Sequence, residues 1–126
     1  MSRPGLRAAI ERGIAAHWVG RIEEALASYR EALAIVPDDP EAMSLMGLAM
    51  THSDQAKEAL PLLVRAVELE PAQIGFRLNL VEGLAKARHY ERALSELKHV
   101  IDHHPDNVRA WEKTGDIAAV QMDVDG

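Results

Sequence analysis

The sequence of 126 residues contains no cysteine, few aromatic side chains and no long hydrophobic run. Without cysteine, the chain has no disulfide framework, cysteine-ligated zinc site, iron–sulfur cluster or thiol nucleophile. Aromatic residues make up 4 % of the chain, so it offers little surface on which nucleic-acid bases could stack. No apolar segment approaches the roughly 18 residues that a membrane-spanning helix needs. We therefore expect no membrane segment and, because the N-terminus has no signal-peptide core, a cytoplasmic protein.

The charge balance is acidic, with 20 Asp and Glu residues against 14 Lys and Arg residues and a formal net charge of −6. Nucleic-acid binding relies on a positive surface that displaces counterions, so we expect no nucleic-acid partner. Hydrophobic residues make up 48 % and charged residues 27 %, as in ordinary globular proteins. The length predicts a single domain over residues 1–126.

A repeat of 34 residues organises the chain. When the sequence is shifted by this period, prolines, alanines and leucines fall on one another. The coinciding residues are Pro37, Pro71 and Pro105, then Ala25, Ala59 and Ala93, then Leu26, Leu60 and Leu94. Fixed-period self-similarity is the signature of repeat architectures, in which stacked units share a continuous core.

Each period reads as two helices. Met43, Met46, Gly47 and Met50 follow the spacing i, i+3, i+4, i+7 of one helix face, and the other segments repeat this pattern. The predicted helices cover residues 5–18, 21–36, 39–51, 54–70, 72–87, 90–103 and 106–121. Because no segment alternates as a strand does, the sequence predicts an all-α protein.

The pattern resembles the tetratricopeptide repeat (TPR) family. The second repeat supplies the matching positions Met43, Met46, Gly47, Met50, Ala59, Leu63, Ala66 and Pro71. The resemblance implies three full repeats over about 6–39, 40–73 and 74–107 and a partial fourth over 108–126. It also implies a TPR-type α-solenoid, a right-handed superhelix of antiparallel helix pairs with about seven helices.

The fourth repeat begins with Trp111, Thr114, Gly115 and Ala118 and lacks a second helix. Residues 122–126 read as the turn that would precede this helix. We therefore expect a fragment of a longer protein; the alternative is a chain that ends on a lone capping helix.

We expect neither a metal site nor a catalytic residue. His99 and His103 lie four residues apart and could share a metal, but no third ligand is assured. The paired carboxylates are accounted for by helix capping and outer helix faces, and the chain has no Gly-rich phosphate loop or nucleophile elbow. The chain is accordingly predicted not to be an enzyme and to use no cofactor.

In the TPR family, the first helices of successive repeats line a concave groove that binds a peptide or a helix. The resemblance places in this groove Arg7, Ile10, Ile14, His17, Trp18, Ser44, Leu45, Leu48, Thr51, His52, Leu78, Asn79, Glu82, Lys86, Arg109 and Glu112. The first end is apolar and the last end is charged and mostly acidic. We therefore expect a protein or peptide partner with an apolar anchor at one end and basic character at the other.

One subgroup of the family binds acidic chaperone tails through a carboxylate clamp of Lys, Asn and Arg side chains. The matching positions here are Ile10, Ile14, Leu45, Gly75 and Asn79. Among them Asn79 alone could serve, so we expect no chaperone-type clamp.

Two alternatives to a peptide-binding module stay open at this stage. The chain could be an accessory region of a larger enzyme, for example a transferase with N-terminal repeats. It could also be a self-associating scaffold that forms a homodimer through its apolar C-terminal helix.

Overall fold

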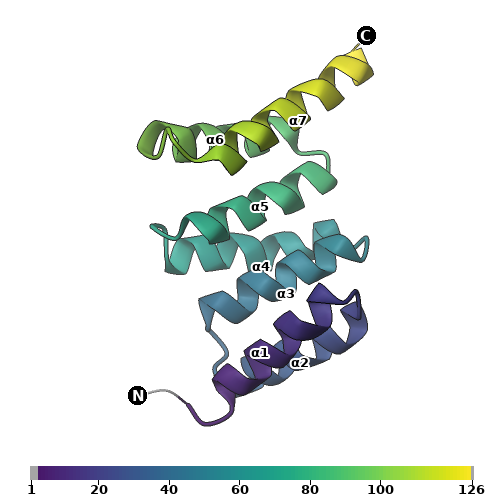
Figure 1. The fold of residues 1–126 in the computed structure, drawn as a ribbon, viewed down its shortest axis with the longest axis vertical. Coiled ribbons are helices and arrows are strands. Elements are labelled where there is room, and N and C mark those ends of the chain that lie inside the picture. Colours follow the sequence, from purple (N-terminus) through teal and green to yellow (C-terminus); the bar gives the residue numbers. More distant parts are fainter. Residues whose placement is uncertain (1–2, 126) are drawn as a thin grey trace.

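The computed structural model describes residues 3–125, with side chains up to Met122. Within this range the chain forms seven helices and no strand. The helices are α1 (Leu6–Trp18), α2 (Ile22–Ile35), α3 (Pro40–His52), α4 (Ala56–Leu69), α5 (Ile74–Lys86), α6 (Tyr90–His103) and α7 (Val108–Asp125). They stack along one long axis with the two termini at opposite ends (Figure 1). The predicted all-α solenoid is confirmed.

Short links with recurring chemistry separate the helices. Asp39 caps α3, since its carboxylate accepts a hydrogen bond from the Ala42 amide at 2.9 Å, and Pro40 follows in the first turn. The amide of Ala110 in the first turn of α7 is bonded in the same way by the side chain of Asn107 at 2.9 Å. These caps satisfy amides that have no partner inside the helix.

The turn inside each helix pair requires a left-handed backbone conformation at one position. This residue is Gly20 in the first pair (φ 80°), Asp54 in the second (φ 64°) and Arg88 in the third (φ 66°), at intervals of 34 residues. Glycine adopts positive φ freely, whereas a residue with a Cβ atom is strained there. The same turn is therefore built three times, with strain at Arg88.

Glycine also allows the helices of a pair to cross closely. A Cβ atom on Gly47 would lie 2.6 Å from Leu63 Cγ, and one on Gly13 would overlap the ring of Tyr29. Val81 stands at the same repeat position in α5, and α5 and α6 approach each other less closely than the first two pairs do. The third pair is consequently the loosest of the three.

The core runs as a layer between the helices along the whole stack. Its first part joins α1, α2 and α3 around Ile10, Leu26 and Tyr29, and its larger part joins α4 to α7 around Leu63 and Leu84. None of the described helices is both long and apolar enough to cross a membrane.

One boundary differs from the prediction. We predicted that the last helix ends at residue 121 and that residues 122–126 form a turn, but α7 continues to Asp125. Gly126 lies outside the described residues. The segment contains no proline and no glycine before Gly126, so its sequence has no residue that would interrupt the helix.

Candidate functional site

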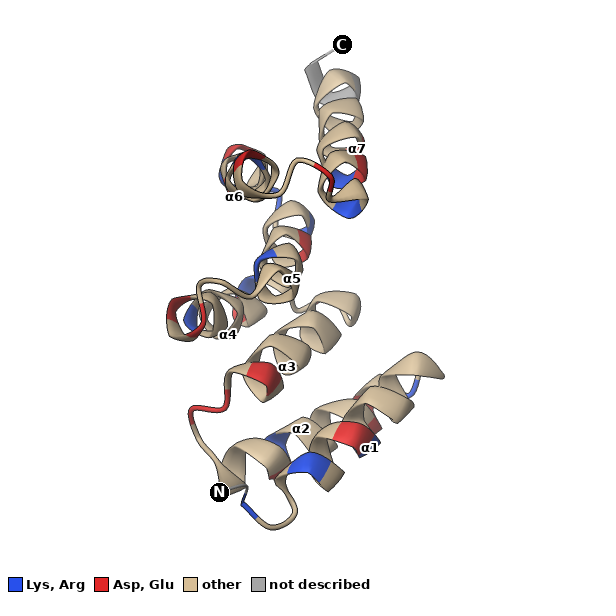
Figure 2. Ribbon diagram, turned by 60° about the vertical axis from the view of Figure 1, so that its left-hand side comes forward, with Lys and Arg blue, Asp and Glu red and all other residues tan. Residues whose placement is uncertain are grey.

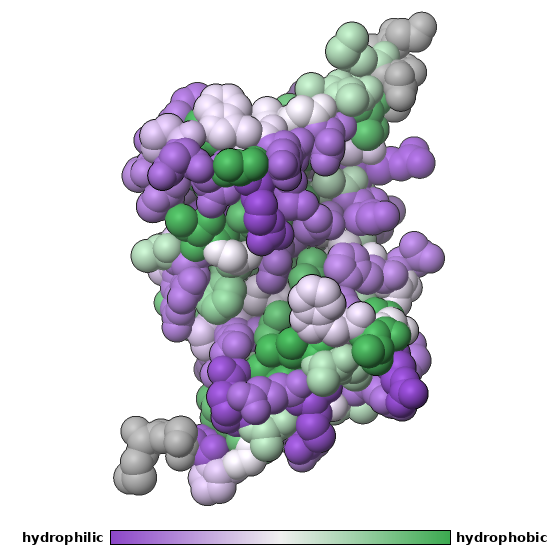
Figure 3. Space-filling model, in the orientation of Figure 1, coloured by the Kyte–Doolittle hydropathy of each residue, from purple (hydrophilic) through white to green (hydrophobic). Residues whose placement is uncertain are grey.

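The odd-numbered helices α1, α3, α5 and α7 share one face of the stack, with α2, α4 and α6 behind them (Figure 1). Apolar residues gather on this face over α1 and α3, whereas the part over α5 and α6 is more hydrophilic (Figure 3). Figure 2 shows that Lys and Arg are interspersed with Asp and Glu along the described part of the stack. Among the clefts of the described residues, one lies between α1 and α3 and another between α5 and α7.

The first cleft, which we call the α1–α3 cleft, has a volume of about 400 Å³. It is lined by Ile14, His17, Trp18, Tyr29, Leu45, Leu48 and His52. It is open because α1 and α3 touch along a short stretch only. An ion pair from Arg7 to Glu41 at 2.8 Å and a bond between His17 Nε2 and His52 Nδ1 at 2.9 Å bridge the two helices.

Two titratable groups in this cleft have shifted pKa values. Burial, and secondarily the charge of Glu41, raises the pKa of Tyr29 to about 12, so the phenol keeps its proton. Burial and the neighbouring His52 lower the pKa of His17. The His17 ring is therefore neutral at pH 7, and the His17–His52 bond joins one donor nitrogen to one acceptor nitrogen.

Trp18 ends α1 at the mouth of this cleft and is 85 % exposed. A tryptophan with so much of its surface in water contributes little to the core, although it carries a large apolar area. It is thus available to cover an occupant of the cleft.

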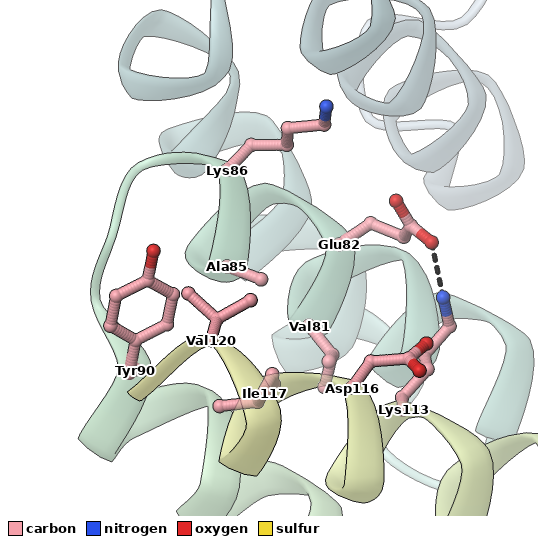
Figure 4. A pocket seen from close by; sticks show the side chains of 9 residues that line it. All are labelled: Val81, Glu82, Ala85, Lys86, Tyr90, Lys113, Asp116, Ile117 and Val120. Atoms are coloured by element: carbon pink, nitrogen blue, oxygen red, sulfur yellow. Dashed lines mark hydrogen bonds and ion pairs between the residues drawn. The ribbon is translucent and has the colours of Figure 1, made fainter. Parts of the chain in front are cut away.

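The second cleft, the α5–α7 cleft, has a volume of about 190 Å³. Its lining residues are Val81, Glu82, Ala85, Lys86, Tyr90, Lys113, Asp116, Ile117 and Val120. In Figure 4 the apolar side chains form the floor, and Glu82, Lys113 and Asp116 lie along one side. Lys113 donates a hydrogen bond to Glu82 across the cleft.

The two clefts occupy the same place in the repeat, two periods apart. Six of the seven residues that line the α1–α3 cleft have a counterpart in the α5–α7 cleft, Tyr29 being the exception: Ile14 and Glu82, His17 and Ala85, Trp18 and Lys86, Leu45 and Lys113, Leu48 and Asp116, His52 and Val120. Four apolar side chains of the first cleft are thus replaced by charged ones in the second, whereas its two histidines are replaced by Ala85 and Val120. The face thus has two clefts at one repeat position; the first is mostly apolar, and the second combines an apolar floor with charged side chains.

The intervening interface between α3 and α5 is closed in its middle, whereas a cleft of about 410 Å³ opens at its end beside Pro40, Glu41 and Phe76. These helices pack more closely than α1 and α3 do. Asn79 of α5 donates a hydrogen bond from Nδ2 to the Ser44 hydroxyl of α3 at 2.9 Å.

The predicted groove residues divide into two groups. Those left exposed or half-exposed are Arg7, Ile14, His17, Trp18, Leu45, Leu48, His52, Asn79, Glu82, Lys86, Arg109 and Glu112. The other four, Ile10, Ser44, Thr51 and Leu78, are at most 2 % exposed. In the structure as it stands, these four side chains offer almost no surface that a ligand could contact.

Their burial has a physical reason. Ile10, Ser44 and Leu78 share one repeat position, which faces the next helix pair, whereas Glu112 at this position in α7 is exposed. Thr51 instead donates its hydroxyl hydrogen to the carbonyl of Gly47 at 2.8 Å. The prediction treated two neighbouring stripes of the odd-numbered helices as groove, but one of them packs between repeats.

Sequence reasoning also missed Tyr29, which lines the α1–α3 cleft from α2. The family pattern assigns this position to the core, and the residue is indeed fully buried. A signal was present, because Gly13 stands opposite Tyr29 and leaves room for its ring to pass.

The His99–His103 pair lies on the exposed side of α6, with ring centroids 4.4 Å apart. His103 Nδ1 bonds the carbonyl of His99 at 2.8 Å. Among the side chains that the structure describes, residues 3–122, no three His, Asp or Glu residues come together as metal ligands would.

Comparisons with known proteins agree with the repeat register. A family model described as TPR repeat matches residues 19–51, and one described as tetratricopeptide repeat matches residues 50–117. Over 76 residues the chain is 29 % identical to the peroxisomal targeting signal receptor of Eremothecium gossypii, covering 60 % of this chain. The matched part is 13 % of that receptor, so the chain corresponds to a small part of this curated relative.

Two solved structures illustrate the similarity in fold. An O-GlcNAc transferase mutant from Thermobaculum terrenum is 27 % identical with a TM-score of 0.85, over 93 % of this chain and 23 % of that one. The first TPR of Spaghetti (RPAP3), bound to an HSP90 peptide, is 16 % identical with a TM-score of 0.85, over 97 % of this chain and 99 % of that one. At 16 % identity the second similarity concerns the fold alone.

Proposed function

Because the chain belongs to the tetratricopeptide repeat family, we propose that it is a protein-interaction module that binds a peptide or partner domain along the α1, α3, α5 and α7 face. The observation that carries the proposal is the pair of clefts at one repeat position, since a ligand running along the face meets an opening at both places. The first TPR of Spaghetti (RPAP3), which binds an HSP90 peptide, supports peptide binding by this fold.

The partner's chemistry follows from the two clefts. The α1–α3 cleft presents Ile14, Leu45 and Leu48 and suits an apolar anchor. The α5–α7 cleft presents Asp116 and Lys86 beside the Glu82–Lys113 pair and suits a segment that carries both basic and acidic residues. Electrostatic complementarity of this kind fixes the direction in which the partner lies.

An acidic tail held by a carboxylate clamp is not part of this proposal. At the five clamp positions, Ile10 is buried, Ile14 and Leu45 are apolar, and Gly75 has no side chain. Asn79 is already bonded to Ser44. These positions lack the cations that would neutralise a carboxylate.

A second candidate is an accessory region of a larger enzyme. The 27 % identity to the Thermobaculum terrenum O-GlcNAc transferase mutant favours it, because this chain matches 23 % of that longer one. Under this proposal the groove positions a protein substrate, and the chemistry takes place outside the chain.

The proposal is tested by panning a random linear peptide library on the chain and measuring affinities by calorimetry. We expect the selected peptides to carry a bulky apolar residue and basic residues. Leu48→Asp should abolish binding, and Trp18→Ala should cost about 2 kcal/mol, or roughly thirtyfold, because truncating an aromatic anchor has this effect. Ala27→Asp, on the exposed side of α2, provides the charge-matched control. Selected peptides that bind all these variants equally would contradict the proposal.

A further inference from the structure

The α5–α7 cleft carries four charged side chains, and two of them already neutralise each other. Glu82 and Lys113 are half-buried and bond each other across the cleft. The ion pairs of the described side chains include neither Lys86 nor Asp116, and both residues are exposed. These two charges are therefore accessible to the charges of a ligand.

The two accessible charges lie at opposite edges of an apolar floor. In Figure 4, Lys86 stands at one edge of the cleft and Asp116 at the other, and apolar side chains such as Val81, Ala85 and Val120 lie between them. Lys86 belongs to the last turn of α5, whereas Asp116 belongs to α7. A segment that crosses this cleft therefore meets a positive charge on one side and a negative charge on the other.

Helix packing does not require charge at these two positions. Trp18 and Leu48 stand at the same repeat positions in the α1–α3 cleft, and both are apolar. A cation in the last turn of α5 does complement the negative end of the helix dipole, which accounts in part for Lys86. The same argument gives no reason for Asp116, which lies in the middle of α7.

The floor of the cleft defines the size of the residue that it can accept. Val81 and Ile117 are nearly fully buried, whereas Ala85, Tyr90 and Val120 keep surface that a ligand can contact. The cleft volume of about 190 Å³ is below the range of small-molecule pockets, which span about 300–1,000 Å³. This is room for one small apolar side chain, with the flanking residues of the ligand left at the charged edges.

We propose that the α5–α7 cleft binds one small apolar residue of a peptide segment that places an acidic residue beside Lys86 and a basic residue beside Asp116. The inference rests on the proposed peptide-binding function and adds the specificity of one subsite. Lys86 and Asp116 are its specificity-determining residues, because opposite charges across an interface select the partner that complements both.

The test uses four acetylated and amidated pentapeptides that share a central valine and glycine ends. The two residues that flank the valine are Glu and Lys, Lys and Lys, Glu and Glu, or Gln and Gln. Each probe is titrated into the isotope-labelled full chain and followed by NMR. The mixed-charge probe should bind most tightly and shift the amides of Ala85 and Val120. Each ion pair should contribute about two- to fivefold at low salt, as exposed pairs do, and less at high salt.

Charge reversal separates ligand selection from a structural role. Asp116→Lys leaves two positive edges, so the probe with two glutamates should become the tightest. Lys86→Glu leaves two negative edges, so the probe with two lysines should become the tightest. A variant that gains a new preferred probe is necessarily folded. Glu23→Lys and Arg30→Glu make the same changes in net charge on the exposed side of α2 and should leave the probe order unchanged.

The outcomes that overturn the inference differ from those that overturn the proposed function. A wild-type chain without preference for the mixed-charge probe, an unchanged probe order in both cleft variants, or no amide shifts in the cleft would each overturn the inference. Library peptides that bind the face in a Leu48-dependent manner would still uphold the proposed function. Peptides insensitive to Leu48→Asp would contradict that function itself.

Discussion

Replacing Gly47 by alanine probes the close crossing of α3 and α4. The added Cβ atom would lie 2.6 Å from Leu63 Cγ and 2.7 Å from Leu63 Cδ2, well inside van der Waals contact. Leu63 is fully buried and cannot turn into solvent. Overpacking of this kind costs about 1–3 kcal/mol. Alanine is also the better helix former by about 1 kcal/mol, which offsets part of this cost.

A matched control isolates the clash from the helix propensity. Gly115 lies in α7, and a Cβ atom there would meet nothing within 4 Å. Gly115→Ala should therefore stabilise the protein by up to about 1 kcal/mol. The difference in unfolding free energy between the two variants should equal the overpacking cost of about 1–3 kcal/mol.

Urea denaturation followed by circular dichroism measures both variants. Adding Leu63→Ala to Gly47→Ala should relieve the clash, so the two changes together should cost less than the sum of their separate effects. If Gly47→Ala were as stabilising as Gly115→Ala, α3 and α4 would not cross at Gly47. The 34-residue register would then be misassigned.

Three further predictions follow from particular contacts. Arg88→Gly should stabilise the chain by about 1 kcal/mol, because Arg88 has φ 66° and a side chain at such φ costs roughly this amount. Urea denaturation would measure this gain in stability, and an unchanged denaturation midpoint would contradict the prediction. Burial and His52 lower the pKa of His17 from 6.5, so the unfolded chain binds more protons and stability should fall as the pH drops below 6.5. His17→Gln should flatten this pH dependence of stability between pH 7.5 and 5.5. If the variant kept the wild-type slope, other titratable groups would cause the dependence. Trp111 and Val120 of α7 are 53 % and 41 % exposed, so we predict that the chain dimerises as its concentration rises. Val120→Glu should remove this dimer. Light scattering that shows a monomer at every concentration would refute the prediction.

Much of the fold was predictable because the same sequence signals for helices and links occur in three successive repeats. Pro37, Pro71 and Pro105 mark the links, and the predicted helices agree with the observed ones within two residues, apart from the C-terminal end of α7. Gly13 and Gly47 mark the crossings in the first two pairs. A period of this kind can be recognised in the sequence without knowledge of any side-chain contact.

The site was less predictable, since helical spacing does not tell which of two adjacent stripes packs against the next repeat. Ile10 and Ile14 are both apolar and one turn apart, yet Ile10 is buried and Ile14 lines the cleft. The His17–His52 bond depends on how far α1 and α3 diverge. This divergence comes from tertiary packing and leaves no mark in the spacing of residues.

The most direct test of the central claim is an NMR map of a library-selected peptide bound to the isotope-labelled chain. The account predicts that the shifted amides lie on α1, α3, α5 and α7, with the largest shifts around Ile14 and Leu48. Shifts confined to α2, α4 and α6 would contradict it, because the ligand would then occupy the opposite face of the solenoid.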